Sequence, residues 1–222
     1  MSHDSQELAD QGFALPETPD ERHFFGLMTS VNNSGANGVA FLTLDEEDHT
    51  LTVEAAALGL EPNQEHPFHI HGFADDRPSE LPTIGQDTDL DGFVESPEGG
   101  LVFGPVLLPL TQDDSGDFPV ADAEGVIEFS ETYTFDVNDP EQAANFAELV
   151  ARLEGRGIQF HGLELPDGAG DGTDHEVNGT GGYITALPVA NGIIEELPAG
   201  ITPELLDTLG VTPLDVADFF FV

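Results

Sequence analysis

Lysine is absent from this chain of 222 residues, and only four basic residues are present, all of them Arg. Against them stand 44 Asp and Glu residues, which give a formal net charge of −40 at pH 7. Proteins bind DNA, RNA and anionic membrane surfaces through clusters of basic side chains. Four Arg spread over positions 22, 77, 152 and 156 do not supply such a cluster. The composition therefore excludes nucleic acids as partners.

Cysteine is also absent, which excludes disulfides, thiolate metal sites and a cysteine nucleophile. No apolar run approaches the roughly 18 residues of a membrane-spanning helix. The first residues, Met1 to Ser5, contain neither the basic nor the apolar segment of a secretory signal. We therefore expect no membrane insertion. The expected location is cytoplasmic, or extracellular if a targeting segment has been removed.

The large negative charge indicates an unusual solvent. Small soluble domains usually carry a net charge of about 2–8 in magnitude. The Debye length falls from about 8–10 Å at ordinary ionic strength to about 3 Å at 1 M, so concentrated salt makes the repulsion local. We interpret the chain as a protein of an extreme halophile. The alternative is a disordered acidic chain, but the 39% hydrophobic residues, with 16 Phe, are enough for a core.

Short apolar segments separated by Gly, Pro and Asp dominate the rest of the sequence. In one of them Leu51, Val53 and Ala55 alternate with Thr52 and Glu54, the pattern of a half-buried strand. About eight such strands predict an all-β fold, an antiparallel Greek-key sandwich or barrel. The predicted strands are 23–29, 39–44, 51–57, 67–73, 101–110, 126–135, 157–165 and 183–194.

One helix is expected within the series of strands. Asp139 is a suitable N-cap, Pro140 fits the first turn, and Gly155 follows the apolar stripe as a stop. Two short helices are expected near the end of the chain, each opened by Thr-Pro, at residues 202 and 212.

These signals divide the chain into three parts. Residues 1–20 are expected to be a flexible acidic arm, 21–196 a β-sandwich and 197–222 a helical appendage. The last four residues, Phe219-Phe220-Phe221-Val222, form an apolar tail. Such a tail, if exposed, would serve as a contact in a homo-oligomer.

Three histidines stand in matching strand contexts. His69 and His71 share one face of the strand 67–73, because side chains alternate along a strand, and His161 ends a similar run in 157–165. Three neutral imidazoles on one outer face are a donor set that copper and zinc favour. The alternative is three unrelated surface histidines. His66 and His175 are further candidates for a fourth ligand. The residues expected behind the three histidines, in the core, are Phe68, Ile70, Ile158 and Phe160.

These segments resemble a known family. Residues 154–161 (EGRGIQFH) resemble the strand that carries the third copper histidine of Cu/Zn superoxide dismutases, and residues 69–71 (HIH) resemble that family's copper pair. Residues 190–194 (ANGII) resemble its closing strand, with Asn191 at the position of the disulfide cysteine. The chain is also similar to CHRD (chordin-type) domains. The resemblance spans roughly residues 23–195 and implies a β-sandwich with a copper-type site of three His.

The chain departs from the dismutase pattern at residues that the reaction uses. No His lies between His71 and His161, so the family's bridging and zinc histidines have no counterpart. Residues 183–189 contain no Arg, whereas the family has a guiding Arg before its closing strand. Superoxide is an anion that positive charge steers toward copper. We therefore expect little dismutase activity.

A second metal motif lies between the histidine strands. Residues 87–98 (DTDLDGFVESPE) fit the calcium-loop pattern D-x-D-x-D-G-x5-E throughout. The alternative is a chance match in an acidic chain. No amphipathic helix is predicted beside it, so we expect a structural calcium clamp between strands. The expected ligands are the carboxylates of Asp87, Asp89, Asp91 and Glu98, the carbonyl oxygen of Phe93, and Glu95 through water.

The sequence thus favours a metal-binding protein with a binding or interaction role, with Ca²⁺ in the loop and Cu²⁺ or Zn²⁺ at the histidines. One alternative is a mononuclear copper or zinc enzyme with an open coordination position. Another is a purely structural module whose histidines bind no metal.

The charge makes a prediction about salt. We expect the folded state to require molar salt and to lose structure on dialysis to roughly 0.1 M, where screening is weak. Circular dichroism melts at both salt concentrations measure this. Identical melts would contradict the interpretation as a halophilic protein.

Overall fold

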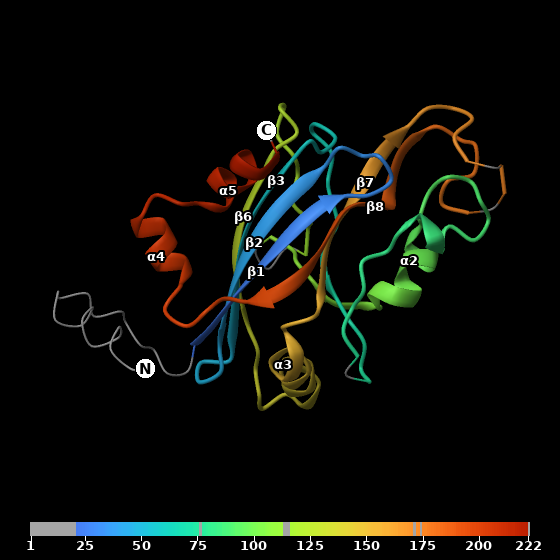
Figure 1. The fold of residues 1–222 in the computed structure, drawn as a ribbon. Helices are drawn as coiled ribbons and strands as arrows, with labels where there is room; N and C mark the ends of the chain where they lie inside the picture. Colours follow the sequence, from blue (N-terminus) through green and yellow to red (C-terminus); the bar gives the residue numbers. More distant parts are fainter. Residues whose placement is uncertain (1–20, 76, 113–115, 171, 174, 222) are drawn as a thin grey trace, which may run out of the picture.

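The computed structural model describes residues 21–75, 77–112, 116–170, 172–173 and 175–221 (Figure 1). The predicted arm, residues 1–20, lies outside the described residues. The strands are β1 (Glu21–Ser30), β2 (Asn37–Asp45), β3 (Thr50–Leu58), β4 (Phe68–His71), β5 (Val106–Pro109), β6 (Ile127–Thr134), β7 (Gly157–Leu165) and β8 (Gly182–Glu196). The helices are the 3₁₀ turn η1 (Ile84–Gln86), α2 (Ser96–Phe103), α3 (Pro140–Arg152), α4 (Pro203–Thr208) and α5 (Pro213–Phe221).

The eight strands form one antiparallel sheet in the order β5-β4-β7-β8-β1-β2-β3-β6, curled into a half-barrel (Figure 1). The chain makes β1, β2 and β3 in succession, moves to the other end of the sheet for β4 and β5, and returns to pair β6 with β3. This return is Greek-key connectivity. The predicted all-β antiparallel fold is confirmed.

The curl brings the two ends of the sheet together. β8 is 15 residues long; its first part pairs with β7 and its last part with β1. Across the barrel, the ring of Phe68 on β4 meets that of Phe129 on β6 edge to face, with centroids 5.5 Å apart. The Tyr133 hydroxyl on β6 donates a hydrogen bond of 2.9 Å to the carbonyl of Thr111, just beyond β5.

The core fills the inside of the curl. Phe68, Ile70, Ile158 and Phe160 are each 0% exposed, as predicted for the inner faces of β4 and β7. The rings of Phe68 and Phe160 stack with their centroids 3.9 Å apart and their planes 2° from parallel. Full burial of such a side chain contributes about 1.5–3 kcal/mol.

The predicted helices are confirmed. The side chain of Asp139 accepts hydrogen bonds from the backbone N–H groups of Glu141 and Gln142, at 2.9 and 3.1 Å, and so caps α3. α4 and α5 begin at Pro203 and Pro213, and α5 packs on β2 and β3. Among the described residues no helix is long and apolar enough to cross a membrane.

The strand predicted at 101–110 is wrong in its first part, and a second inserted helix is present. α2 follows the acidic loop directly, and only 106–109 is a strand. The helix starts because Glu95 and Glu98 form a capping box around Pro97, which suits a first turn. It ends at Gly104, whose φ of 96° favours glycine and whose added Cβ would collide with the backbone of Gly72.

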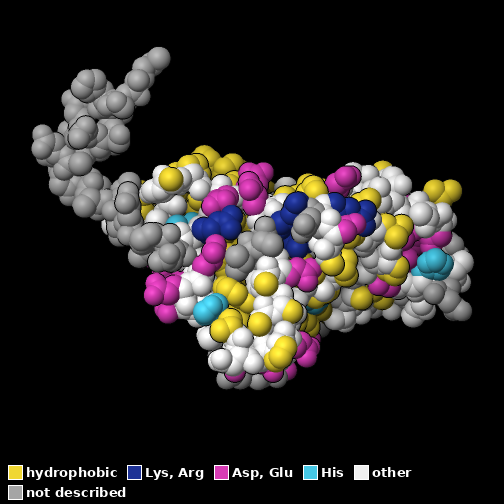
Figure 2. All heavy atoms as spheres, turned by 90° about the horizontal axis from the view of Figure 1, so that it is seen from below, with side chains coloured by type: hydrophobic (Ala, Val, Ile, Leu, Met, Phe, Trp, Pro, Cys, Tyr) yellow, Lys and Arg dark blue, Asp and Glu magenta, His cyan; other side chains and the backbone are white. Residues whose placement is uncertain are grey.

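Acidic side chains separate the few basic ones on the surface. Figure 2 shows a face on which basic side chains lie among Asp, Glu and apolar groups. Arg22 forms an ion pair of 2.9 Å with Glu196, and Arg77 lies 3.4 Å from Asp75. These exposed pairs contribute little to stability in screened solvent.

The ring stack yields a prediction about stability. Phe160→Ala should lower the free energy of unfolding by about 3–5 kcal/mol, because it opens a cavity beneath β4 and β7. Phe219→Ala is the matched control, because Phe219 is 82% exposed and its replacement should change stability by less than about 0.5 kcal/mol. Chemical denaturation at one fixed, high salt concentration compares them. Equal effects of the two substitutions would contradict the assigned core.

Candidate functional site

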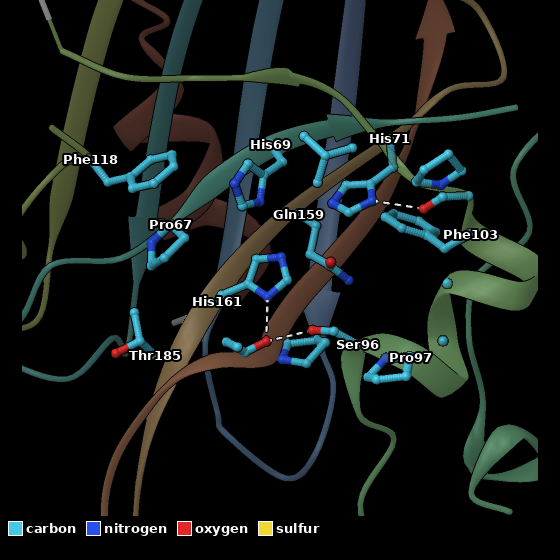
Figure 3. Close-up of a pocket in the computed structure, with 17 residues that line it drawn as sticks. Pro67, His69, His71, Ser96, Pro97, Phe103, Phe118, Gln159, His161 and Thr185 are labelled. Carbon is cyan, nitrogen blue, oxygen red and sulfur yellow. Dashed lines mark hydrogen bonds between the residues drawn. The ribbon is translucent and has the colours of Figure 1, made fainter. Parts of the chain in front are cut away.

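The pairing of β4 with β7 brings the three predicted histidines together. The register places His69 opposite Gln159 and His71 opposite Gly157, with the apolar side chains on the inner face. One ligand nitrogen from each of His69, His71 and His161 lies within 4.8 Å of the others. Figure 3 shows the three rings pointing toward one another. The prediction that they share one outer face is confirmed.

A bulge in β7 sets the direction of His161. The pairing of β7 with β8 shifts register on both sides of this residue. The next residue, Gly162, has a φ of 107°, and a Cβ there would collide with the hydroxyl of Tyr183. Only glycine fits this place.

Hydrogen bonds fix which nitrogen two of the three rings present. His71 Nδ1 lies 3.0 Å from the carbonyl oxygen of Gly104, and His161 Nδ1 lies 2.7 Å from that of Ala186. A carbonyl only accepts, so both Nδ1 atoms carry the proton and both Nε2 atoms keep a lone pair. These Nε2 atoms and His69 Nδ1 are buried without a hydrogen-bond partner. Buried polar atoms without partners are rare, and three that converge in this way could hold a metal ion.

Burial keeps the three rings neutral. It lowers the pKa of His69 to about 4, of His71 to about 4 and of His161 to about 3. Repulsion between the rings lowers the pKa of His69 and His161 further. Near pH 7 all three lone pairs are therefore available to a cation.

The three nitrogens open into a cavity of about 600 Å³. Its walls are mainly apolar and include Phe103 and Phe118; Ser96 and Gln159 add polar groups (Figure 3). Among the described residues that line it, none is Asp, Glu or Arg. A cavity of this size accommodates a small molecule next to a bound ion.

His66 lies behind the site and outside the group of three. Its side chain is completely buried, and its Nδ1 and Nε2 lie 2.8 and 3.1 Å from the carbonyl oxygens of His161 and Glu61. Both ring nitrogens of His66 thus contact backbone carbonyls, one of which belongs to the candidate ligand His161. His66 positions the backbone of His161, a role that sequence reasoning did not assign.

The acidic loop folds back on its own carboxylates. Asp87 accepts hydrogen bonds from the N–H groups of Leu90 (2.7 Å) and Gly92 (3.0 Å), and Asp91 accepts one from Phe93 (2.8 Å). Carboxylate oxygens of Asp87, Asp89 and Asp91 lie within 4.8 Å of one another. The loop thus groups three of the predicted ligands where they are able to hold a cation.

The other two acidic residues of the motif sit where the loop enters α2. Glu98 accepts hydrogen bonds from the backbone N–H and the hydroxyl of Thr88, both at 2.6 Å, and from Glu95 N–H at 3.2 Å. Glu95 accepts one from the N–H of Val177 at 2.7 Å. Both are buried, and their role as ligands stays a prediction.

Close packing of these carboxylates is electrostatically costly. Burial raises the pKa of Asp91, and the neighbouring charges of Asp89, Glu95 and Asp87 raise it further. Burial likewise raises the pKa of Glu176, which accepts a hydrogen bond from Ser96 N–H. A cation in the loop would relieve this repulsion.

The two clusters share a wall. Ser96, the first residue of α2, donates a hydrogen bond of 2.6 Å to the carbonyl of Ala186, which also accepts from His161 Nδ1 (Figure 3). The Asn32 amide donates to the carbonyls of Val94 and Pro188, at 3.0 Å each. Neither Ser96 nor Asn32 carries a motif that sequence reasoning recognises.

The depressed pKa values make the metal-free protein sensitive to acid. Each histidine binds a proton less readily when folded than when unfolded, so the stability it contributes above pH 6.5 is lost as the pH falls. Between pH 7 and 5 the parent should lose about 2 kcal/mol more than His161→Gln, since one pKa unit corresponds to about 1.4 kcal/mol. Denaturation curves with chelator, at fixed high salt, test this. Parallel losses in both proteins would contradict a buried neutral His161.

Comparison with known proteins gives no indication of the function, which has to be inferred from the arrangement of the side chains. No protein-family model matches the sequence, and no curated protein matches it either.

Proposed function

We propose that this protein binds Cu²⁺ or Zn²⁺ through His69 Nδ1, His71 Nε2 and His161 Nε2. The observation that carries the proposal is the convergence of three imidazoles, with one ligand nitrogen of each within 4.8 Å of the others. Each ring has a buried nitrogen without a hydrogen-bond partner. Imidazole donors suit copper and zinc. The carbonyls of Gly104 and Ala186 orient two of the rings, as outer partners of metal-bound histidines do.

The cavity favours a second candidate, a mononuclear metalloenzyme. Three protein ligands leave a position for water or a small molecule, and here that position faces the cavity of about 600 Å³. Turnover would also use an acid or a base beside the metal. The described residues that line the cavity include no Asp or Glu that could act as this acid or base, and no Arg. A binding role therefore comes first. A purely structural role would not explain why three buried histidine nitrogens lack hydrogen-bond partners.

We further propose that the chain is related to the Cu/Zn superoxide dismutase and CHRD β-sandwiches. The Greek-key strand order and the placement of the HxH pair on β4 beside His161 on β7 support the relation. Dismutase activity is a poorer fit. Arg156 is only 2% exposed and donates to the carbonyl of Phe73, so it lends no exposed positive charge to the cavity.

We propose a divalent cation, calcium by its spacing, for the acidic loop. The grouping of Asp87, Asp89 and Asp91 supports it, with the carbonyl of Phe93 and the carboxylate of Glu98 as further oxygen donors. Such an ion would act as a structural clamp between β4 and β5.

Substitution of one histidine tests the copper or zinc site. His161→Ala should weaken binding of Zn²⁺ by more than about 100-fold, because even changes outside the ligand set cost 10–100-fold. The His161→Ala variant should still fold, since the side chain of His161 points away from the core. His23→Ala is the matched control, because His23 on β1 contacts Thr43 instead.

Calorimetry with Zn²⁺ and electron paramagnetic resonance with Cu²⁺, in chelator-treated high-salt buffer and without a His tag, give the readouts. The copper spectrum of the parent should report nitrogen ligands, and superoxide decay should match that of buffer with the same copper. Equal Zn²⁺ stoichiometry and equal Zn²⁺ affinity in His161→Ala and the parent would refute the site. Rapid superoxide decay would favour the enzyme.

A further inference from the structure

His175 joins the acidic loop from a distant part of the chain. It lies in the connection between β7 and β8, whereas Asp89 and Glu95 lie between β4 and β5. Its Nδ1 atom is 3.2 Å from Asp89 Oδ2 and 3.3 Å from Glu95 Oε2. One ligand atom from each of these three residues lies within 4.8 Å of the others.

Burial distinguishes this group from an ordinary acidic surface. The side chain of Glu95 is only 2% exposed; one of its oxygens accepts from Val177 N–H, and the other points to His175. Asp89 Oδ2 is buried and has no hydrogen-bond partner, although His175 Nδ1 lies 3.2 Å from it as an ion-pair contact. Asp91 Oδ2, in the same loop, is also buried without a partner. Buried carboxylate oxygens without hydrogen-bond partners are suited to bind a cation.

Charge leads to the same conclusion. Asp87, Glu95 and Glu98 are buried within twelve residues of sequence, and Asp89 and Asp91 lie among them. Even when protonated, His175 supplies a single positive charge to its two carboxylate partners. Burying negative charge without compensation is costly, and a dication bound at this point compensates more of it.

We propose that Asp89 Oδ2, Glu95 Oε2 and His175 Nδ1 bind a first-row transition dication, with Zn²⁺ or Mn²⁺ as the chemical type. Calcium takes oxygen ligands, whereas a nitrogen donor combined with carboxylates suits a transition metal. The position is separate from the three-histidine site and does not depend on it. It adjoins the calcium-type loop, with which it shares Asp89 and Glu95.

An ion here would join two loops above the cavity. Glu95 precedes Ser96, whose hydroxyl bonds to the carbonyl that orients His161. His175 precedes Glu176 and Val177, which bond to Ser96 and Glu95. The proposed ion therefore fastens the β7–β8 connection to the start of α2, one wall of the cavity.

The test uses a background in which the three-histidine site is disabled. In His71→Ala/His161→Ala, Co²⁺ is titrated at molar NaCl with 5 mM Ca²⁺ present, and visible absorption reports ligand-field bands. We expect one Co²⁺ per chain in this background. Adding His175→Ala should weaken Co²⁺ binding by more than about tenfold, since a direct ligand is lost. Adding His23→Ala instead should change nothing.

The outcomes separate this site from the others. Unchanged Co²⁺ affinity after His175→Ala, or no bound Co²⁺ while calcium binds, would overturn the proposal and leave an all-oxygen calcium loop. Should the double variant fail to fold, the parent and its His175→Ala form are compared directly. Because the His175 side chain is 43% exposed, that variant should fold and bind one Co²⁺ fewer than the parent. Equal stoichiometry would again overturn the proposal.

Discussion

The stack of Phe68 on Phe160 is the contact on which the arrangement of the site depends. It holds β4 and β7 in a single register, with both apolar faces turned inward. Side chains alternate with a period of two, so a slip of one residue would send the histidines of β4 into the core. The outward direction of His69 and His71 is thus a consequence of hydrophobic packing, while the bulge at His161 adjusts the third ring. Packing of the inner faces of β4 and β7 therefore determines which way the three histidine side chains point.

The same logic explains what the sequence predicted well. Alternation in β3, β4 and β7, and the Asp-Pro start of α3, are local signals that burial and capping reinforce. They were sufficient for the all-β fold and for the grouping of the three histidines. The error at residues 101–110 arose because an apolar run of that length suits a strand or a buried helix equally well. The capping box of Glu95 and Glu98 favours the helix, but the same two carboxylates also fit the calcium-loop pattern, so the sequence does not single out the capping role.

The features that could not be predicted from the sequence are contacts between loops that lie far apart along the chain. His175 meets Asp89 only because the β7–β8 connection lies over the acidic loop, and no periodicity describes that approach. Asn32 links Val94 to Pro188 from the turn between β1 and β2, again without a local signal. The sequence offers His66 as a possible fourth ligand, but in the structure its two ring nitrogens contact the carbonyl oxygens of His161 and Glu61. Long-range hydrogen bonds of this kind depend on the finished topology.

The hydrogen bond from His66 to the carbonyl of His161 spans 95 positions of sequence. Closing so long a segment costs chain entropy, and β proteins rich in pairings of high sequence separation fold slowly. The cavity between β4 and β7 depends on such a pairing. The proposed ion, bound there, would stabilise the native state and would so prolong the lifetime of the folded protein.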